Sequence, residues 1–292
     1  MKLVLRASQG SRQAGFSLVE MMISMLLGLM ILAAAIAVFY SNRASYQANQ
    51  GLARVQENAR VAFELMARDI RAAGSTGCSN AAKPETATTD WPEFPSQPVS
   101  GHGPGAVAGS TGDSIEVLSA GDAPIGIESQ TATTLTLRTD VHPFQDNDIL
   151  VVCDAAKVFV FEATDVTDEV ITHAGLPGGW NFFDNIMPSS ASVVVATLAA
   201  NHWYVAPNPR GGSSLWVSRT GGAGEEVAEG VQDMTISYLE RGQTDYNPTP
   251  GSVNWANLIA VKVQMSLGAV DPRGNAINRN IENVVSLRTQ AL

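Results

Sequence analysis

Apolar side chains form a long run near the start of the chain. The run extends from residue 16 to residue 40 and is interrupted only by Ser17, Glu20, Ser24 and Gly28. A helix needs about 20 apolar residues to cross the hydrocarbon core of a bilayer. The sequence therefore predicts that residues 16–40 form the transmembrane half of an N-terminal helix.

The apolar pattern continues past this run with a different spacing. Across 41–73, apolar side chains recur every three or four residues, which is the spacing of one face of a helix. They are Leu52, Val55, Ala59, Phe63, Met66 and Ile70. No proline before Pro84 interrupts this helix, and Gly74 and Gly77 indicate where it ends. We expect one helix over 16–73, about 85 Å long, whose amphipathic half at 41–73 packs on a soluble body.

The rest of the chain carries the patterns of β-strands. Residues 75–112 are rich in Pro, Gly, Ser and Thr, and we expect a long loop there. Beyond it, short segments rich in β-branched and aromatic residues predict strands. These segments are 114–118, 133–139, 149–153, 157–164, 192–198, 203–206, 215–218, 234–240 and 258–267. The predicted fold class is α+β, with the long N-terminal helix packed on a largely antiparallel β-sheet in a β-rich globular domain, 74–292.

Charge is distributed unevenly along the chain. The net charge is −10, but residues 74–251 alone hold 22 acidic and 6 basic side chains. Such a surface repels phosphate backbones, so we expect no nucleic-acid binding by the globular domain. Lys2, Arg6 and Arg12 precede the apolar run, and no acidic residue occurs before Glu20. This basic excess predicts a cytoplasmic N-terminus and a globular domain on the periplasmic side of the inner membrane.

The chain has two cysteines, Cys78 and Cys153, and the predicted orientation places both on the periplasmic side. Two cysteines in an exported chain suggest one disulfide. The alternative is a pair of free thiols, one of them buried in a strand.

The junction before the apolar run has a specific motif. It reads Gly15-Phe16-Ser17-Leu18-Val19-Glu20 after a short basic segment. This resembles the type IV prepilin signature, in which a basic leader and a glycine precede Phe-Ser/Thr-Leu-Val/Ile-Glu at the start of an apolar helix. The resemblance implies that a prepilin peptidase removes 1–15 as a leader by cutting between Gly15 and Phe16. It also implies N-methylation of Phe16 and retention of the helix.

Glu20 is an acid inside a segment that is expected to lie in lipid. A carboxylate there costs a few kcal/mol unless it is paired. The resemblance implies that the glutamate meets the α-amine of Phe16 from a neighbouring subunit and so sets the register of assembly. The alternative is that Glu20 only reaches back to the cytoplasmic interface.

Other segments resemble a particular group, the PilW-like minor pilins. They are 69–74 leading to Gly77 and Cys78, 231–238, 255–263 and 283–288. This resemblance implies a protein that primes pilus assembly and joins the pilus tip, supporting twitching motility and adhesion. The implied partners are other minor pilins, the major pilin, the inner-membrane assembly platform, the prepilin peptidase and a large tip adhesin.

The sequence gives no pattern of enzyme chemistry. His102, His142, His173 and His202 have no metal-ligand spacing, and no nucleophile elbow, P-loop or dinucleotide fingerprint occurs. We therefore expect no catalytic residue, no metal and no cofactor. The acids Asp146, Asp148 and Asp154, with Asp165, Asp168 and Glu169, are interpreted as solvated strand ends rather than a calcium site. Trp203 and Trp216 are interpreted as core or interface aromatics.

Two other functions fit part of the pattern. A pseudopilin of the type II secretion system shares the leader, the helix and the assembly principle. A signal-anchored periplasmic enzyme could carry an N-terminus that only mimics a prepilin, in which case prepilin peptidase would leave it uncut.

Overall fold

The structure is a computed structural model that describes residues 15, 17–78, 83–84, 94, 97–121, 123–176, 179, 181–183, 193–270 and 276–288. The predicted helix is confirmed as α1, Leu18–Ala72, a single helix of 55 residues. It ends where Gly74 takes a left-handed φ of 74°, because glycine adopts that conformation without steric cost. Gly74 N then donates to Leu118 O at 2.9 Å, which joins the helix end to the sheet.

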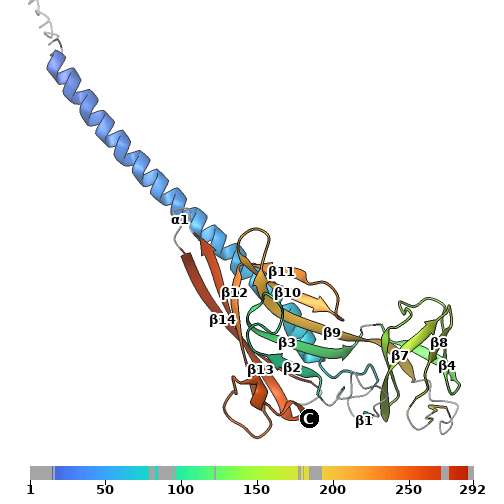
Figure 1. Cartoon of the computed structure of the whole chain (residues 1–292). Coiled ribbons are helices and arrows are strands. Elements are labelled where there is room, and N and C mark those ends of the chain that lie inside the picture. Colours follow the sequence, from blue (N-terminus) through green and yellow to red (C-terminus); the bar gives the residue numbers. More distant parts are fainter. Residues whose placement is uncertain are drawn as a thin grey trace, which may run out of the picture.

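The C-terminal half of α1 packs on two antiparallel sheets (Figure 1). One sheet has the order β12-β13-β14, while the other contains β2, β3, β9, β10 and β11, paired in that order. The strand bounds are β2 Val99–His102, β3 Thr111–Ala120, β9 Val194–Pro207, β10 Ser213–Arg219, β11 Glu225–Glu229, β12 Val231–Glu240, β13 Leu258–Val270 and β14 Ala276–Ser286. Short 3-10 turns, η2 Pro250–Ser252 and η3 Trp255–Asn257, lie between β12 and β13.

Helix and sheets share one hydrophobic core. Ala59, Met66 and Ile70 of α1 are fully buried in it together with side chains from both sheets. These are the positions of the amphipathic stripe, so the prediction that the sheet covers the second half of the helix is confirmed. The helix approaches the β11–β12 turn so closely that a Cβ on Gly230 would lie 2.9 Å from Val55 Cγ1.

A second unit is inserted between β3 and the end of β9. Its strands are β4 Ile125–Gln130, β5 Thr134–Leu137, β6 Ile149–Cys153, β7 Lys157–Val166 and β8 Val170–His173. Pairing runs from β9 to β6, β7, β8, β5 and β4, and β4 pairs again with β9. The six strands therefore close into a small antiparallel barrel, filled by apolar side chains such as Leu135, Leu150, Phe159 and Ile171. The barrel lies beyond the C-terminal end of α1 (Figure 1).

Two features join the barrel to the helical unit. The start of β9, at Val194–Thr197, belongs to the barrel, and its remainder pairs with β3 and β10. The predicted disulfide is confirmed: Cys78, just after α1, is bonded to Cys153 at the end of β6, with their Cα atoms 6.0 Å apart. A small core that includes Phe94, Val151 and Leu198 surrounds the bond.

Several strand predictions need correction. The segments 192–198 and 203–206 are one continuous strand, β9, because the small residues between them still fit a pleated surface. The predicted loop 75–112 contains β2 and the two-residue β1, Lys83–Pro84, which pairs with β7. Strands β4, β8, β11 and β14 have no counterpart among the predicted segments.

Candidate functional site

The start of α1 presents the motif residues to solvent. Gly15 is exposed, and a Cβ built on it meets no other atom within 4 Å. Ser17 is the N-cap, and its carbonyl accepts from Met21 N at 3.1 Å. Glu20 lies exposed in the first turn. Phe16 lies outside the described residues, so the structure places only one side of the predicted cleavage point.

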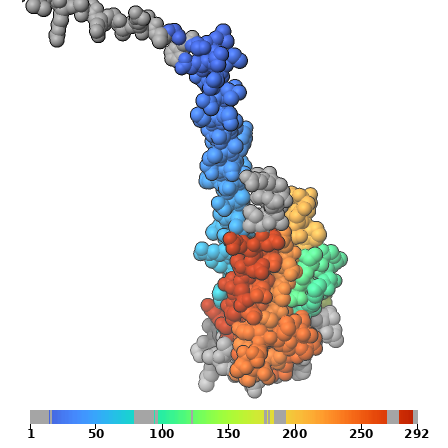
Figure 2. Space-filling model, turned by 90° about the vertical axis from the view of Figure 1, so that its left-hand side faces the viewer, coloured from blue at the N-terminus to red at the C-terminus, as the bar shows by residue number. Residues whose placement is uncertain are grey.

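Within the described residues, the first half of α1 extends away from the folded body (Figure 2). Its most apolar 18-residue window has a mean hydropathy of 2.6, and none of that window is buried. Large apolar side chains such as Leu18 and Ile31 are 76% and 71% exposed. Ser24 Oγ donates to Glu20 O at 2.7 Å, so its hydroxyl is satisfied within the helix. This half of the helix is built to contact lipid or other apolar helices.

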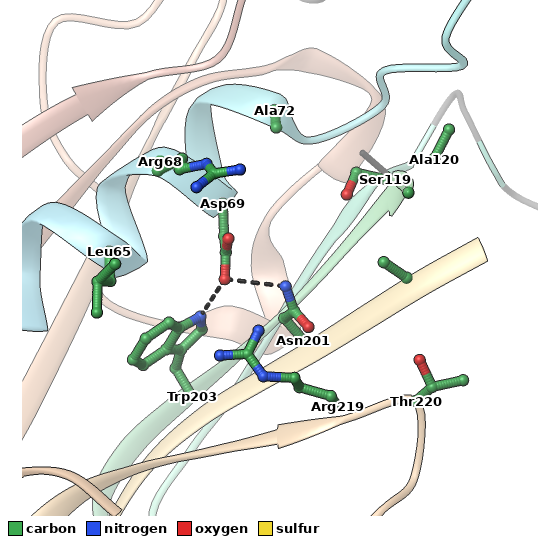
Figure 3. A pocket seen from close by; sticks show the side chains of 12 residues that line it. Leu65, Arg68, Asp69, Ala72, Ser119, Ala120, Asn201, Trp203, Arg219 and Thr220 are labelled. Atoms are coloured by element: carbon green, nitrogen blue, oxygen red, sulfur yellow. Dashed lines mark hydrogen bonds between the residues drawn. The ribbon is translucent and has the colours of Figure 1, made fainter. Parts of the chain in front are cut away.

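A polar site that the sequence reasoning missed lies at the other end of α1. Asp69 points from the helix into the space above β9, where Oδ2 accepts from Asn201 Nδ2 and from Trp203 Nε1, both at 2.9 Å (Figure 3). Trp203 is only 1% exposed, which confirms its interpretation as a core aromatic. The signal in the sequence was an acid three residues after Met66 and next to Ile70, on the buried side of the helix.

A cavity of about 310 Å³ lies beside this carboxylate and is named here the Asp69 cavity (Figure 3). It is formed by the last turns of α1, the end of β3, the middle of β9 and the end of β10. Its lining residues are Leu65, Arg68, Asp69, Ala72, Ser119, Ala120, Gly121, Ala199, Asn201, Trp203, Arg219 and Thr220. Burial raises the pKa of Asp69 above its usual value, and the hydrogen bonds from Trp203 and Asn201 and the charges of Arg219 and Arg68 oppose that rise.

Two histidines that are distant in sequence come together on the sheet. The rings of His102 on β2 and His202 on β9 lie 5.5 Å apart, and Ser114 Oγ lies 3.0 Å from His202 Nε2. Burial lowers the pKa of His202, as does the neighbouring His102, whereas Glu116 raises it. Within the described part of the chain, no three His, Cys, Asp or Glu residues are arranged to hold a metal ion.

Three of the candidate calcium-site acids have local structural roles. Asp146 accepts from Val166 N at 2.8 Å, Asp148 from Gln145 N at 2.8 Å, and Asp154 from Ala156 N and Lys157 N at 2.7 Å. These carboxylates therefore satisfy backbone donors near the ends of β6 and β7.

Residues 10–36 match the family described as the prokaryotic N-terminal methylation motif. The match covers the Gly15–Glu20 junction and most of the apolar run. It supports a type IV pilin-like or pseudopilin-like protein that is anchored in a membrane through α1. No curated protein and no solved structure matches the chain.

Proposed function

We propose that the chain is a PilW-like minor pilin that primes type IV pilus assembly and takes its place in the pilus tip complex. The observation that carries the proposal is the methylation motif at residues 10–36, at the start of a 55-residue helix whose apolar half stands clear of the body. Such a helix can leave the bilayer and pack among the helices of other subunits while the body keeps its fold. The mechanism is assembly, with no chemical step in the globular domain.

Processing occurs at Gly15. The glycine is exposed and has open space around it, which gives a membrane peptidase access to an extended backbone. Cleavage between Gly15 and Phe16 removes the basic leader and leaves α1 intact. The new α-amine, which is then methylated, lies four residues before Glu20.

Glu20 makes the helix dependent on a second subunit. After Arg12 the next basic residue in the sequence is Arg43, 23 residues beyond Glu20 and about 35 Å away along a helix. Once the leader is removed, the chain supplies no side-chain cation within reach of this carboxylate. The methylated amine of Phe16 from a neighbouring pilin provides the countercharge, which avoids the cost of a few kcal/mol for an unpaired acid in lipid.

Charge and redox chemistry support the proposed location. Lys2, Arg6 and Arg12 favour a cytoplasmic leader, and the Cys78–Cys153 disulfide suits an oxidising periplasm. The proposed partners are other minor pilins, the major pilin, the inner-membrane assembly platform, the prepilin peptidase and a large tip adhesin. Twitching motility and adhesion then depend on the fibre that this complex initiates.

The position of the barrel supports a place at the tip. In a fibre whose helices stack along its axis, the next subunit occupies the region beyond the C-terminal end of each helix. The barrel lies in that region (Figure 1). A subunit with such a body fits at the end of the fibre better than within the repeating lattice.

N-terminal mass analysis of the chain purified from its own host tests the assignment. We expect a mature chain that begins with N-methylated Phe16, and we expect Gly15→Val to leave the leader attached because a β-branched side chain obstructs the cut. A mature chain that starts at Met1 or after Ala35 would show that the motif is not processed.

The role of Glu20 is tested by substitution. Glu20→Ala should insert in the inner membrane normally but be lost from sheared pili, whereas Glu57→Ala, an exposed acid in the second half of α1, should be incorporated normally. Equal incorporation of both variants would remove the pairing role. Loss of protein secretion with normal piliation in a deletion strain would instead identify a type II secretion pseudopilin.

A further inference from the structure

Strand β14 is long and has one unpaired edge. It pairs with β13 over 11 residues without a register shift and, among the described residues, with no other strand. Just beyond it, Leu287 N donates to Ile259 O at 3.0 Å, so the odd-numbered residues of this antiparallel ladder bond to β13. The even-numbered residues therefore direct their backbone N–H and C=O groups away from the sheet. They are Asn278, Asn280, Glu282, Val284 and Ser286.

The core of the protein lies on one face of this strand and leaves its edge open. Val285 is buried in the core shared with α1, and Ile281 packs against that core. By contrast, residues 278–280 and 282–284 are all exposed. Figure 2 shows β14, in red, at the surface of the body. Within the described part of the chain, the outward backbone groups therefore face solvent.

The other sheet edges around α1 are protected. β2 has four residues, and β11 has five, of which three are glutamates. On the outer edge of β12, Ile236 N donates to Asp113 Oδ2 at 2.8 Å and Tyr238 N donates to Asn247 O at 2.9 Å. Short length, charge and local capping all prevent an edge from pairing with another chain. β14 is long and regular and contains no proline, so its edge remains able to pair.

A second copy of β14 does not fit this edge while both chains are anchored. Two identical edges that are related by a two-fold axis pair antiparallel, which reverses the direction of one chain. Because β14 runs nearly along α1 (Figures 1 and 2), the reversal would point the two apolar half-helices in opposite directions. Chains anchored in one membrane share one direction, so the occupant is a different polypeptide.

We propose that the open edge of β14 accepts an extended segment of another polypeptide, which adds to the β12-β13-β14 sheet as a fourth strand. A row of outward N–H and C=O groups recognises an extended backbone, whereas side chains at alternate positions select among segments. The charged side chains of β14 are Arg279 and Glu282, of opposite sign. They favour a polar segment without net charge. Strand addition here does not depend on the proposed role in pilus assembly.

A peptide with the sequence of residues 276–286 is the probe. It has no anchor, so it is free to pair antiparallel with β14, and a register that sets its Asn280 opposite Glu282 of the chain opposes no like charges. Fluorescence anisotropy of the labelled peptide should show saturable binding to the full-length chain in non-ionic detergent. Absence of saturable binding overturns the proposal.

Asn280→Pro and Asn280→Ala form a matched pair for this measurement. Both remove the side chain that contacts Ser266 Oγ at 3.0 Å, but only proline removes an outward N–H, at a position that does not bond to β13. Asn280→Pro should weaken peptide binding about tenfold or more, and Asn280→Ala should change it little. Equal binding by the two variants overturns the proposal.

Hydrogen exchange on the unmodified chain gives a readout that needs no variant. The peptide should slow exchange of the even-numbered amides of β14, while amides of β11 stay unchanged. Unchanged exchange in β14 at saturating peptide overturns the proposal. Light scattering without peptide should show a monomer in its detergent micelle. A dimer that Asn280→Pro dissociates would make a second copy the occupant and overturn the assignment to a different polypeptide.

Discussion

Gly101 on β2 lies against the ring of Tyr238 from β12. A Cβ at this glycine would collide with Tyr238 Oη and would lie 2.9 Å from Trp255 Cη2. The Tyr238 and Trp255 rings themselves pack edge to face, with centroids 4.9 Å apart. We expect Gly101→Ala to lower the free energy of unfolding by about 1–3 kcal/mol through overpacking, measured by denaturant titration followed by circular dichroism.

Tyr238→Phe provides the matched comparison. Among the described residues the buried Tyr238 hydroxyl has no hydrogen-bond partner, and its removal leaves no new unsatisfied group. Tyr238→Phe alone should therefore be neutral or stabilising by up to about 1 kcal/mol. Combined with Gly101→Ala it should recover part of the lost stability, because Oη is the nearest atom in the collision. A double variant as unstable as the sum of the two changes would contradict this packing.

His173, fully enclosed in the barrel, makes stability depend on pH. Its Nδ1 accepts from Gly175 N at 3.0 Å, and burial lowers the pKa of the ring below its usual 6.5. The folded state favours the neutral ring. The contribution of His173 to the free energy of unfolding is therefore fully present above the ordinary pKa of 6.5 and is lost as the pH falls toward the lowered pKa of the folded state. Unfolding titrations between about pH 7 and pH 5 should show this loss.

His173→Asn is the control for that pH dependence. Its Oδ1 can still accept from Gly175 N, but the side chain does not titrate. The variant should lose less stability between the two pH values than the unmodified chain. Some dependence should remain, because burial also lowers the pKa of His202. An unchanged slope would show that His173 is not the group responsible.

At the scale of elements, strong local patterns were predictable and edge strands were not. The run 149–153 coincides with β6, since all five residues are apolar and four of them are buried. Strand β14 is polar and asparagine-rich, and β11 reads Glu-Glu-Val-Ala-Glu. Each forms because a neighbouring strand offers hydrogen bonds, and that neighbour is fixed by tertiary packing. Closure of the barrel depends on pairings between distant segments, which single-segment patterns do not carry.

The candidate sites also differed in whether the sequence could predict them. The motif around Gly15 and Glu20 is contiguous, so sequence reading found it. The Asp69 cavity needs α1, β3, β9 and β10 together, and Asn201 and Arg219 have no distinctive sequence context. Only the position of Asp69 on the apolar side of the amphipathic helix could have indicated a buried acid.

The disulfide connects two elements that otherwise meet through a small core. Cys78 and Cys153 are 75 residues apart in sequence, so the bond restricts a long loop of the unfolded chain. Replacing both with Ala should lower the free energy of unfolding by about 3–4 kcal/mol, measured by denaturant titration. Reductant should destabilise the unmodified chain by a similar amount and leave the double variant unaffected. Destabilisation of the double variant by reductant would contradict this account.

At the scale of the molecule, the barrel and the helical unit should unfold together. Strand β9 contributes to both cores, and the disulfide joins the end of α1 to β6. Differential scanning calorimetry of the oxidised chain in detergent should give a single transition with matching calorimetric and van't Hoff enthalpies. Reduction should separate an earlier transition of the barrel. Two resolved transitions in the oxidised chain would show that the units are independent.

A pull between the anchor and the barrel crosses the segment after α1, where the Cys78–Cys153 bond joins the helical unit to β6. The chain between Cys78 and Cys153, which are 75 positions apart in sequence, has a contour length of about 250 Å when extended. While the bond is intact, none of that length can be drawn out, and the pull passes directly to β6. A subunit under tension therefore transmits force to the barrel with almost no extension of the chain.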